Sequence, residues 1–291
     1  MTDLPVHIKA LFLLFIVVYM LSVTLETTSG AIRGTLNDRR LLWGALLTNL
    51  IIVPILGVVL VKLFDLPHDT GIGLLMLAFS PGGLFALQFA RVSKGNLVLA
   101  VGLLLLFSML AVVTTPVLVA LFFPAVGAGR LPLAYLVFLL LLFVVAPIFA
   151  GRAVQRRIPV VAPKLGRLLG ILSIVIFIIG AIASSRHKSP AIKAMGVHGI
   201  AAIVILTLGS WVVGWFSGGP EIRNRKVLAI STSMRNAGVC FPIAINYFPG
   251  TEVVTPILAF SGISIPLNML FALITGFTLR DTKESASSAK A

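Results

Sequence analysis

Charged residues, cysteine and histidine are scarce in this chain of 291 residues, and each shortage excludes a class of protein. Only 11% of the residues are charged, whereas 58% are hydrophobic and the mean hydropathy is +1.10, which excludes a water-soluble globular core. The single cysteine, Cys240, excludes an intrachain disulfide. The four histidines are scattered, so we expect no metal site and no cofactor. The composition predicts an integral membrane protein.

Catalytic and nucleotide-binding patterns are also missing. Acidic residues are nearly absent from the apolar runs, and no histidine in such a run stands at catalytic spacing from a serine or cysteine. No Walker or dinucleotide-binding glycine pattern opens a helix, so neither an enzyme nor an ATP-driven pump is expected. The formal charge is +14, but the basic residues lie in short loops between apolar runs. We therefore expect a lipid bilayer as the partner, and no nucleic acid.

Apolar runs bounded by charge or by Pro and Gly predict an all-α, polytopic membrane protein with nine transmembrane helices. The predicted spans are about 8–28, 40–64, 70–92, 96–123, 130–150, 165–184, 194–216, 226–248 and 252–279. They form one transmembrane domain over residues 1–279, and the polar segment 280–291 is predicted to be a disordered cytoplasmic tail. The first run has no basic n-region and no cleavage site, so we expect a retained helix and not a signal peptide.

The basic residues also predict the orientation in the membrane. Most of the 23 lysines and arginines lie in the segments after the first, third, fifth, seventh and ninth spans. The positive-inside rule places these segments in the cytoplasm, with the N-terminus outside and the C-terminus inside. We expect a plasma membrane, most simply a bacterial one.

Two of the predicted spans are interrupted at mid-span. The third contains Ser80-Pro81-Gly82-Gly83, and the eighth contains residues 231–238, with the sequence STSMRNAG. Proline removes an amide donor and glycine permits unusual backbone angles, so both segments are expected to unwind. Either one alone is also explained by a simple kink. Since the two lie five spans apart, they cross in opposite directions, which predicts inverted repeats of spans one to four and six to nine.

Polar residues at mid-span are the candidate site. Arg235 cannot shed its charge easily and needs an anion, a carbonyl cluster or water at membrane depth. It is either a ligand for a substrate carboxylate, a built-in cation, or a structural clamp for freed carbonyls. The predicted substrate-binding residues are Arg235, Asn236, Asn49, Ser80, Pro81, Gly82, Gly83, Gln88, Ser231 and Asn268. The predicted ligands of a coupling ion, sodium or a proton, are Asn49, Ser231, Thr232 and Met234. Each asparagine is alternatively a hydrogen-bonding contact between helices.

Several segments, in their order and spacing, resemble the bile acid:sodium symporter family over about residues 8–279. They are Met20 with Thr24-Leu25-Glu26, Asn49 to Pro54, Ser80-Pro81-Gly82-Gly83, Lys94-Gly95-Asn96, Thr115-Pro116 and Met234-Arg235-Asn236-Ala237-Gly238. The resemblance implies nine or ten spans in inverted repeats, a panel domain, and a core domain with two discontinuous helices that cross near the binding site.

The ligands that the resemblance implies for sodium are replaced in this chain. The positions of a Ser-Asn pair and two hydroxyls at one cation site hold Ala86, Leu87, Ala100 and Leu104. At the other site, a glutamine is replaced by Asn49, and a glutamate and a glutamine by Ser231 and Arg235. Repulsion between Arg235 and a nearby cation would cost several kcal/mol at an effective dielectric constant near 20. These departures argue against sodium coupling.

The sequence thus predicts a secondary transporter that moves a small organic anion through a cavity between the two helix breaks by alternating access. One alternative is a sodium-coupled symporter that uses other ligands, such as backbone carbonyls. Another is a membrane sensor or binding subunit that transports nothing. No oligomeric state is favoured by the sequence.

Overall fold

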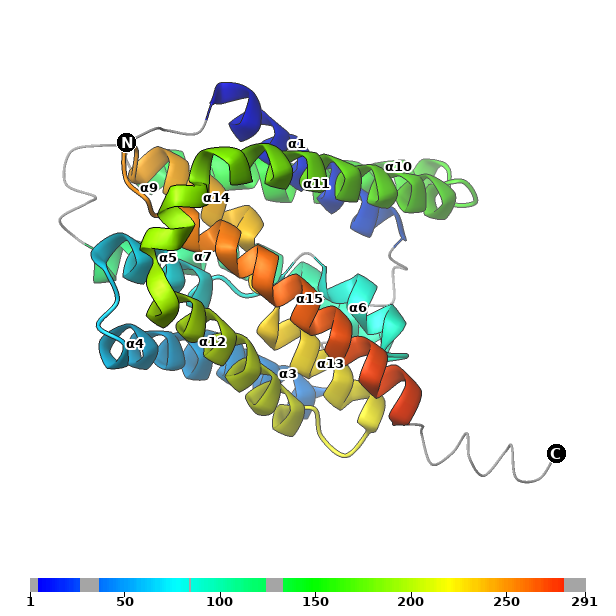
Figure 1. Ribbon diagram of the computed structural model, residues 1–291. Helices are drawn as coiled ribbons and strands as arrows, with labels where there is room; N and C mark the ends of the chain where they lie inside the picture. Colours follow the sequence, from blue (N-terminus) through cyan, green and yellow to red (C-terminus); the bar gives the residue numbers. More distant parts are fainter. Residues whose placement is uncertain (1–4, 27–36, 84, 124–132, 280–291) are drawn as a thin grey trace.

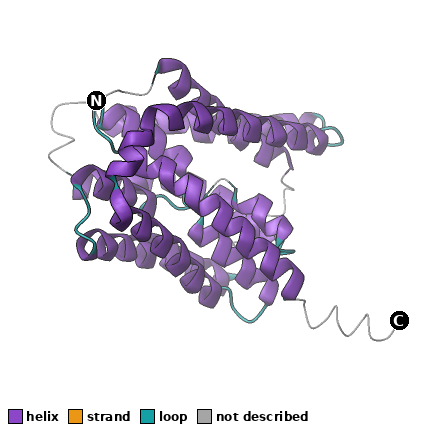
Figure 2. Ribbon diagram, in the orientation of Figure 1, coloured by secondary structure: helices purple, strands orange, loops and turns teal. Residues whose placement is uncertain are grey.

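The structure is a computed structural model, and it describes residues 5–26, 37–83, 85–123 and 133–279. Every regular element in these residues is helical (Figure 2). The helices are α1 Val6–Glu26, α3 Arg39–Leu47, α4 Val53–Leu63, α5 His68–Ala78, α6 Ala86–Val92, α7 Leu97–Phe122, α9 Leu133–Leu140, α10 Ala146–Arg157, α11 Ala162–Ala194, α12 Gly196–Ser217, α13 Ile222–Ser233, α14 Ala237–Tyr247 and α15 Val254–Thr278. Two π-helical turns, η1 Thr48–Ile52 and η2 Leu141–Val145, join α3 to α4 and α9 to α10.

Seven helical stretches in the described residues are long and apolar enough to cross a membrane. They are Val6–Glu26, Arg39–Leu63, Leu97–Phe122, Ala162–Ser184, Gly196–Ser217, Ile222–Tyr247 and Val254–Thr278. The all-helical, polytopic character of the chain is therefore confirmed. The predicted span 70–92 is not among the seven, because it is divided into α5, with 11 residues, and α6, with 7. The predicted span 130–150 begins outside the described residues, as does the predicted tail 280–291.

Apolar side chains face outward as well as inward, as a bilayer requires. Ile171, Val175 and Ile178 recur along one face of α11 and are about half exposed. A helix that is hydrophobic on all sides is typical of a membrane span. Polar caps mark helix starts in the core body: the side-chain oxygens of Asp38 and Asn96 accept from the backbone N–H groups three residues on, at 3.1 and 3.2 Å.

The helices form two bodies (Figure 1). The panel layer consists of α1, α9, η2, α10 and α11, which pack against one another along one side of the molecule. The most extensive packing in this layer is between α1 and α11, where the Ser22 hydroxyl donates to the Gly166 carbonyl at 2.7 Å. A Cβ at Gly166 would lie 2.8 Å from Cγ of Glu26, so a small residue sets this approach.

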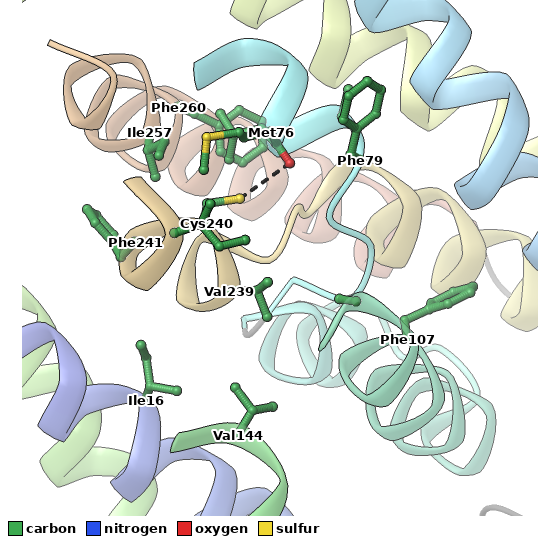
Figure 3. Packing of buried hydrophobic residues seen from close by; sticks show 14 of the residues in the cluster. Ile16, Met76, Phe79, Phe107, Val144, Val239, Cys240, Phe241, Ile257 and Phe260 are labelled. Carbon is green, nitrogen blue, oxygen red and sulfur yellow. Dashed lines mark hydrogen bonds between the residues drawn. The ribbon is translucent and has the colours of Figure 1, made fainter. Parts of the chain in front are cut away.

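The core body contains all the other described helices. Its buried apolar side chains form one continuous hydrophobic cluster with those of the panel layer. Figure 3 shows part of this packing around Cys240, whose thiol donates to the Met76 carbonyl of α5 at 3.4 Å. Phe241, on the next residue of α14, stacks on Phe12 of the panel layer with ring centroids 4.5 Å apart. The two interrupted segments lie within the core body.

Candidate transport site

The two helix breaks cross and share their backbone hydrogen bonds. The Gly83 amide donates to the Met234 carbonyl at 2.8 Å, and the Asn236 amide donates to the Ser80 carbonyl at 2.9 Å. The Ser80 hydroxyl also donates to the Asn236 carbonyl at 3.2 Å. Backbone that leaves a helix at membrane depth needs partners inside the protein. Here each break supplies them to the other.

The glycines of the first break are required by this crossing. Gly82 has a φ of +87°, which side chains with a Cβ rarely adopt. A Cβ at Gly83 would lie 2.4 Å from the backbone of Met234, closer than any real contact. Pro81 has no amide hydrogen to continue the helix of α5. The sequence Ser-Pro-Gly-Gly therefore both unwinds the chain and lets the second break pass against it.

Arg235 lies at the crossing with its guanidinium enclosed by oxygens. Its Nε donates to the Leu77 carbonyl at 3.0 Å, and its Nη2 donates to the Ala78 carbonyl at 2.7 Å. Its Nη1 donates to Oδ1 of Asn49 at 2.8 Å and to the Thr232 carbonyl at 3.1 Å. The fifth N–H, on Nη2, faces the Asn49 carbonyl at 3.5 Å. The side chain is 2% exposed, and all its partners are neutral.

Asn49 is positioned by the π-helical turn η1. Pro54 cannot donate to a carbonyl four residues earlier, and the wider turn bypasses this gap, with the Val53 amide bonded to the Thr48 carbonyl. The Asn49 Nδ2 donates to the Ala45 carbonyl at 3.0 Å and to Oγ1 of Thr232 at 3.1 Å. Its Oδ1 is thereby turned toward Arg235.

A cavity lies where the crossing faces the panel layer. Its walls include Phe15 of α1, Phe177 of α11, Phe85 beside the first break, and Met234 and Arg235 of the second break. The volume is about 20 Å³, which is room for about one water molecule. A second cavity of about 700 Å³ lies between α11, α12 and α15. The two share Phe177, Ser261 and Ile265, so they adjoin.

The boundary between the panel layer and the core body, called the seam below, is filled by aromatic rings. Phe177 lies 5.0 Å from Phe15 and 5.3 Å from Phe85 between ring centroids. Tyr19, one turn after Phe15, has its ring centroid 6.0 Å from that of Phe85. Its hydroxyl is buried and has no hydrogen-bond partner among the described residues. A buried hydroxyl without a partner is costly, so this one is a candidate contact for a passing solute.

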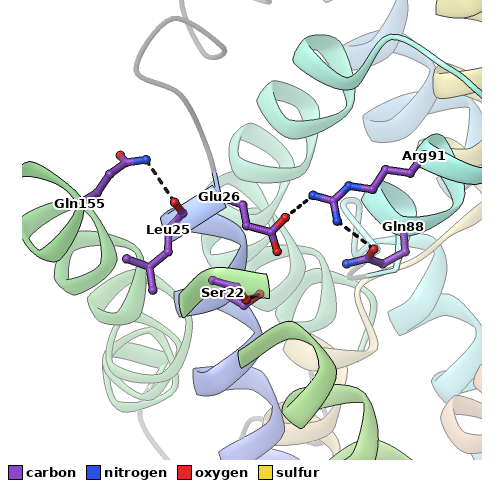
Figure 4. A network of polar contacts seen from close by, with 7 residues as sticks. Ser22, Leu25, Glu26, Gln88, Arg91 and Gln155 are labelled. Carbon is purple, nitrogen blue, oxygen red and sulfur yellow. Dashed lines mark hydrogen bonds and ion pairs between the residues drawn. The ribbon is translucent and has the colours of Figure 1, made fainter. Parts of the chain in front are cut away.

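One end of the seam is joined by charge. Glu26, the last residue of α1, pairs with Arg91 of α6, and Arg91 also donates to Oε1 of Gln88 at 3.2 Å (Figure 4). The Gln155 side chain donates to the Leu25 carbonyl at 3.3 Å and holds the same end of α1 within the panel layer. The pair therefore links the two bodies.

Comparison with known proteins now identifies the family. Residues 12–208 match the family described as "Sodium Bile acid symporter family". The chain belongs to the sodium bile acid symporter family. This is a family of transporters and not of enzymes.

Three curated relatives support this membership at low identity. The "Uncharacterized sodium-dependent transporter YocS" of Bacillus subtilis is 25% identical over 206 residues, which cover 68% of this chain and 62% of the relative. The "Probable sodium/metabolite cotransporter BASS1, chloroplastic" of Arabidopsis thaliana is 24% identical over 245 residues, covering 81% and 59%. The "Probable sodium/metabolite cotransporter BASS2, chloroplastic" of Oryza sativa is 22% identical over 244 residues, covering 81% and 57%. This chain thus spans about three fifths of the length of these relatives.

In this family member, the predicted site residues divide into three groups. Those at the crossing are Arg235, Asn236, Asn49, Ser80, Pro81, Gly82, Gly83, Ser231, Thr232 and Met234. Gln88 instead lies beside Arg91 at the end of the seam. Asn268 joins helices of the core body, since it accepts from Trp211 at 2.9 Å and from Ser233 at 2.6 Å. The roles of all of them in binding a solute or an ion stay predictions.

Aromatic residues of the seam were not among the predicted site residues. Phe15, Phe85 and Phe177 carry no polar atom, and a phenylalanine in a membrane span gives no signal that separates a cavity wall from lipid-facing packing. Tyr19 does give such a signal in the sequence, because its hydroxyl is a polar group in the middle of an apolar run. The positions of the implied sodium ligands, Ala86, Leu87, Ala100 and Leu104, are buried among apolar residues.

Proposed function

We propose that this protein is a secondary transporter that moves a small organic anion by alternating access of the panel layer and the core body. The cavity at the crossing is the main support for this function. Its walls come from both bodies, so a movement of one body against the other opens or closes it. Rigid-body movement of one bundle past another is a known route of alternating access.

The helix packing supports nine spans in inverted repeats. Spans five apart along the chain lie together: α1 packs on α11, α4 packs on α12, and the two breaks cross each other. Two repeats related by an axis within the membrane would bring their equivalent elements together in this way. We place the protein in a plasma membrane, with its N-terminus outside and its C-terminus in the cytoplasm.

The two ends of the seam differ, as one state of an alternating-access cycle requires. At one end, Glu26 lies beside Gly166 of α11 and is paired with Arg91. The larger cavity is lined by Ala181 and Ile182, which lie about 20 Å further along the same helix. The seam is therefore closed by an ion pair at one end and hollow toward the other.

The charge at the crossing favours an anionic solute. Arg235 contacts only neutral oxygens, so its positive charge is not cancelled by a carboxylate. A cavity with apolar walls screens this charge poorly, and the field extends into the cavity. The Tyr19 hydroxyl supplies a hydrogen-bond donor in the same seam.

The proposal is tested by uptake of radiolabelled organic anions into proteoliposomes, with a variant that fills the larger cavity. Gly262 lines this cavity, and a Cβ there would contact nothing within 4 Å. Gly262→Trp is expected to fold and to lose most uptake. The reason is that the indole would fill the larger cavity, through which we propose that the solute reaches the crossing. The matched control is Leu270→Trp on the same helix, at a residue that is 54% exposed, and uptake is expected to persist there.

Normal uptake by Gly262→Trp would contradict the proposal that the solute passes through the larger cavity. Binding of an anion to the wild type without any uptake would contradict transport itself and would favour a binding subunit.

A further inference from the structure

The crossing of the two breaks gathers oxygens of the kind that bind a hard cation. The last turn of α5 provides the carbonyls of Leu77 and Ala78, and α13 provides that of Thr232. Asn49 adds its backbone carbonyl and its Oδ1. Backbone and amide carbonyl oxygens are typical ligands of hard metal cations in proteins. Five such oxygens face one buried point.

That point is occupied by the guanidinium of Arg235. Four of the oxygens lie 2.7–3.1 Å from its nitrogens, and the fifth lies at 3.5 Å. The geometry uses all five N–H groups of the side chain. Asn49 cannot easily turn away, because its Nδ2 is held by Ala45 and Thr232.

A metal ion beside this guanidinium would have no anionic partner among the residues that the structure describes. In the described residues, no group of three or more His, Cys, Asp or Glu side chains could hold a metal ion. The ion pair of Glu26 and Arg91 lies outside the crossing. A second positive charge at the crossing would meet repulsion without compensation.

We infer that the guanidinium of Arg235 fills a cation site built from the crossing carbonyls, so that this transporter works without sodium. The names of the bacterial and plant relatives include sodium, but the residues present here do not fit a sodium ion. The hydrogen bonds of Arg235 alone support the view that its guanidinium fills the site, whereas the sodium independence of transport also rests on the proposed function.

The first test measures the thermal unfolding midpoint of the purified wild type in sodium chloride and in choline chloride at equal ionic strength. A ligand that binds the folded state raises the midpoint in proportion to the logarithm of its concentration. The midpoint is expected to be the same in both salts. A saturable rise with sodium alone would overturn the inference and would leave the proposed transport function standing.

The second test removes the charge and keeps an amide oxygen. In Arg235→Gln, the crossing carbonyls lose the guanidinium and are expected to accept sodium, which gives a midpoint that rises with sodium and not with choline. Absence of this rise in a folded Arg235→Gln protein would overturn the cation site. The wild-type measurement requires no variant, so it shows whether sodium binds even if Arg235→Gln does not fold. Failure to find a transported solute would refute the proposed function without changing either midpoint.

Discussion

Arg235 and Arg91 both connect segments that are far apart in the sequence, but they do so with opposite kinds of partner. Arg235 is 2% exposed, and its partners are neutral oxygens within the core body. The Arg91 side chain is 35% exposed, and its partner is the carboxylate of Glu26 in the panel layer. A charge held by many carbonyls of one body stays in place when the bodies move. A single ion pair between two bodies is broken when they separate, and in a partly exposed position it contributes little stability.

Replacing Arg235 is therefore expected to have the largest effect. Arg235→Ala leaves several buried carbonyls without a donor, and each such group costs roughly 1–3 kcal/mol. We expect a loss of at least about 3 kcal/mol in the free energy of unfolding, a lower folded yield and no uptake. Chemical denaturation in detergent and proteoliposome uptake measure these quantities. The control is Arg223→Ala at the exposed start of α13, and equal stability of the two variants would show that Arg235 is not a clamp.

A methyl group at the crossing is expected to have the next largest effect. In Gly83→Ala, the new Cβ would clash with the Met234 backbone, and overpacking of this kind costs typically 1–3 kcal/mol. Gly262→Ala is the matched control, because its Cβ would contact nothing within 4 Å. We expect a lower thermal midpoint for Gly83→Ala and no change for the control. Equal midpoints would mean that the breaks do not cross as closely as described.

Removing the ion pair between Glu26 and Arg91 is expected to alter transport more than stability. Glu26→Gln removes the ion pair and leaves Arg91, whose side chain is 35% exposed, to water, so the free energy of unfolding should change by less than about 1 kcal/mol. Arg91→Gln leaves the Glu26 carboxylate, whose side chain is 9% exposed, without its cation and should cost about 1–3 kcal/mol. Uptake rates are expected to change several-fold, because the closed end of the seam is no longer favoured. The exchange Glu26→Arg with Arg91→Glu should restore part of the rate. If the exposed control Arg167→Gln changed uptake equally, the pair would have no special role.

Tyr19→Phe is expected to have the smallest effect on folding. The change removes a buried hydroxyl without a described partner, so the free energy of unfolding should be unchanged or raised by up to about 1 kcal/mol. Uptake is expected to fall a few-fold if the hydroxyl contacts the solute. Tyr135→Phe on α9, at a residue that is 44% exposed, is the control. A lower thermal midpoint for Tyr19→Phe would indicate that the hydroxyl has a structural partner instead.

The sequence predicted the breaks better than it predicted the seam. Pro81, Gly82 and Gly83 act through local backbone chemistry, so their effect is visible in one sequence. The environment of Arg235 depends on carbonyls more than 150 residues away, and only the fold shows that these oxygens take up its donors. The Glu26–Arg91 pair is likewise long-range, with the two residues 65 positions apart. The short helices α5 and α6 explain why the span at 70–92 is not recognised by length and composition.

The sodium dependence of uptake decides whether Arg235 is a permanent cation of the core body. Proteoliposomes with the wild type are assayed for an identified solute in sodium chloride and in choline chloride, with equal pH on both sides. The initial rate is expected to be the same in both salts. Uptake that needs sodium and is lost in choline would contradict this expectation, because a sodium ion would then have to bind despite the guanidinium at the crossing.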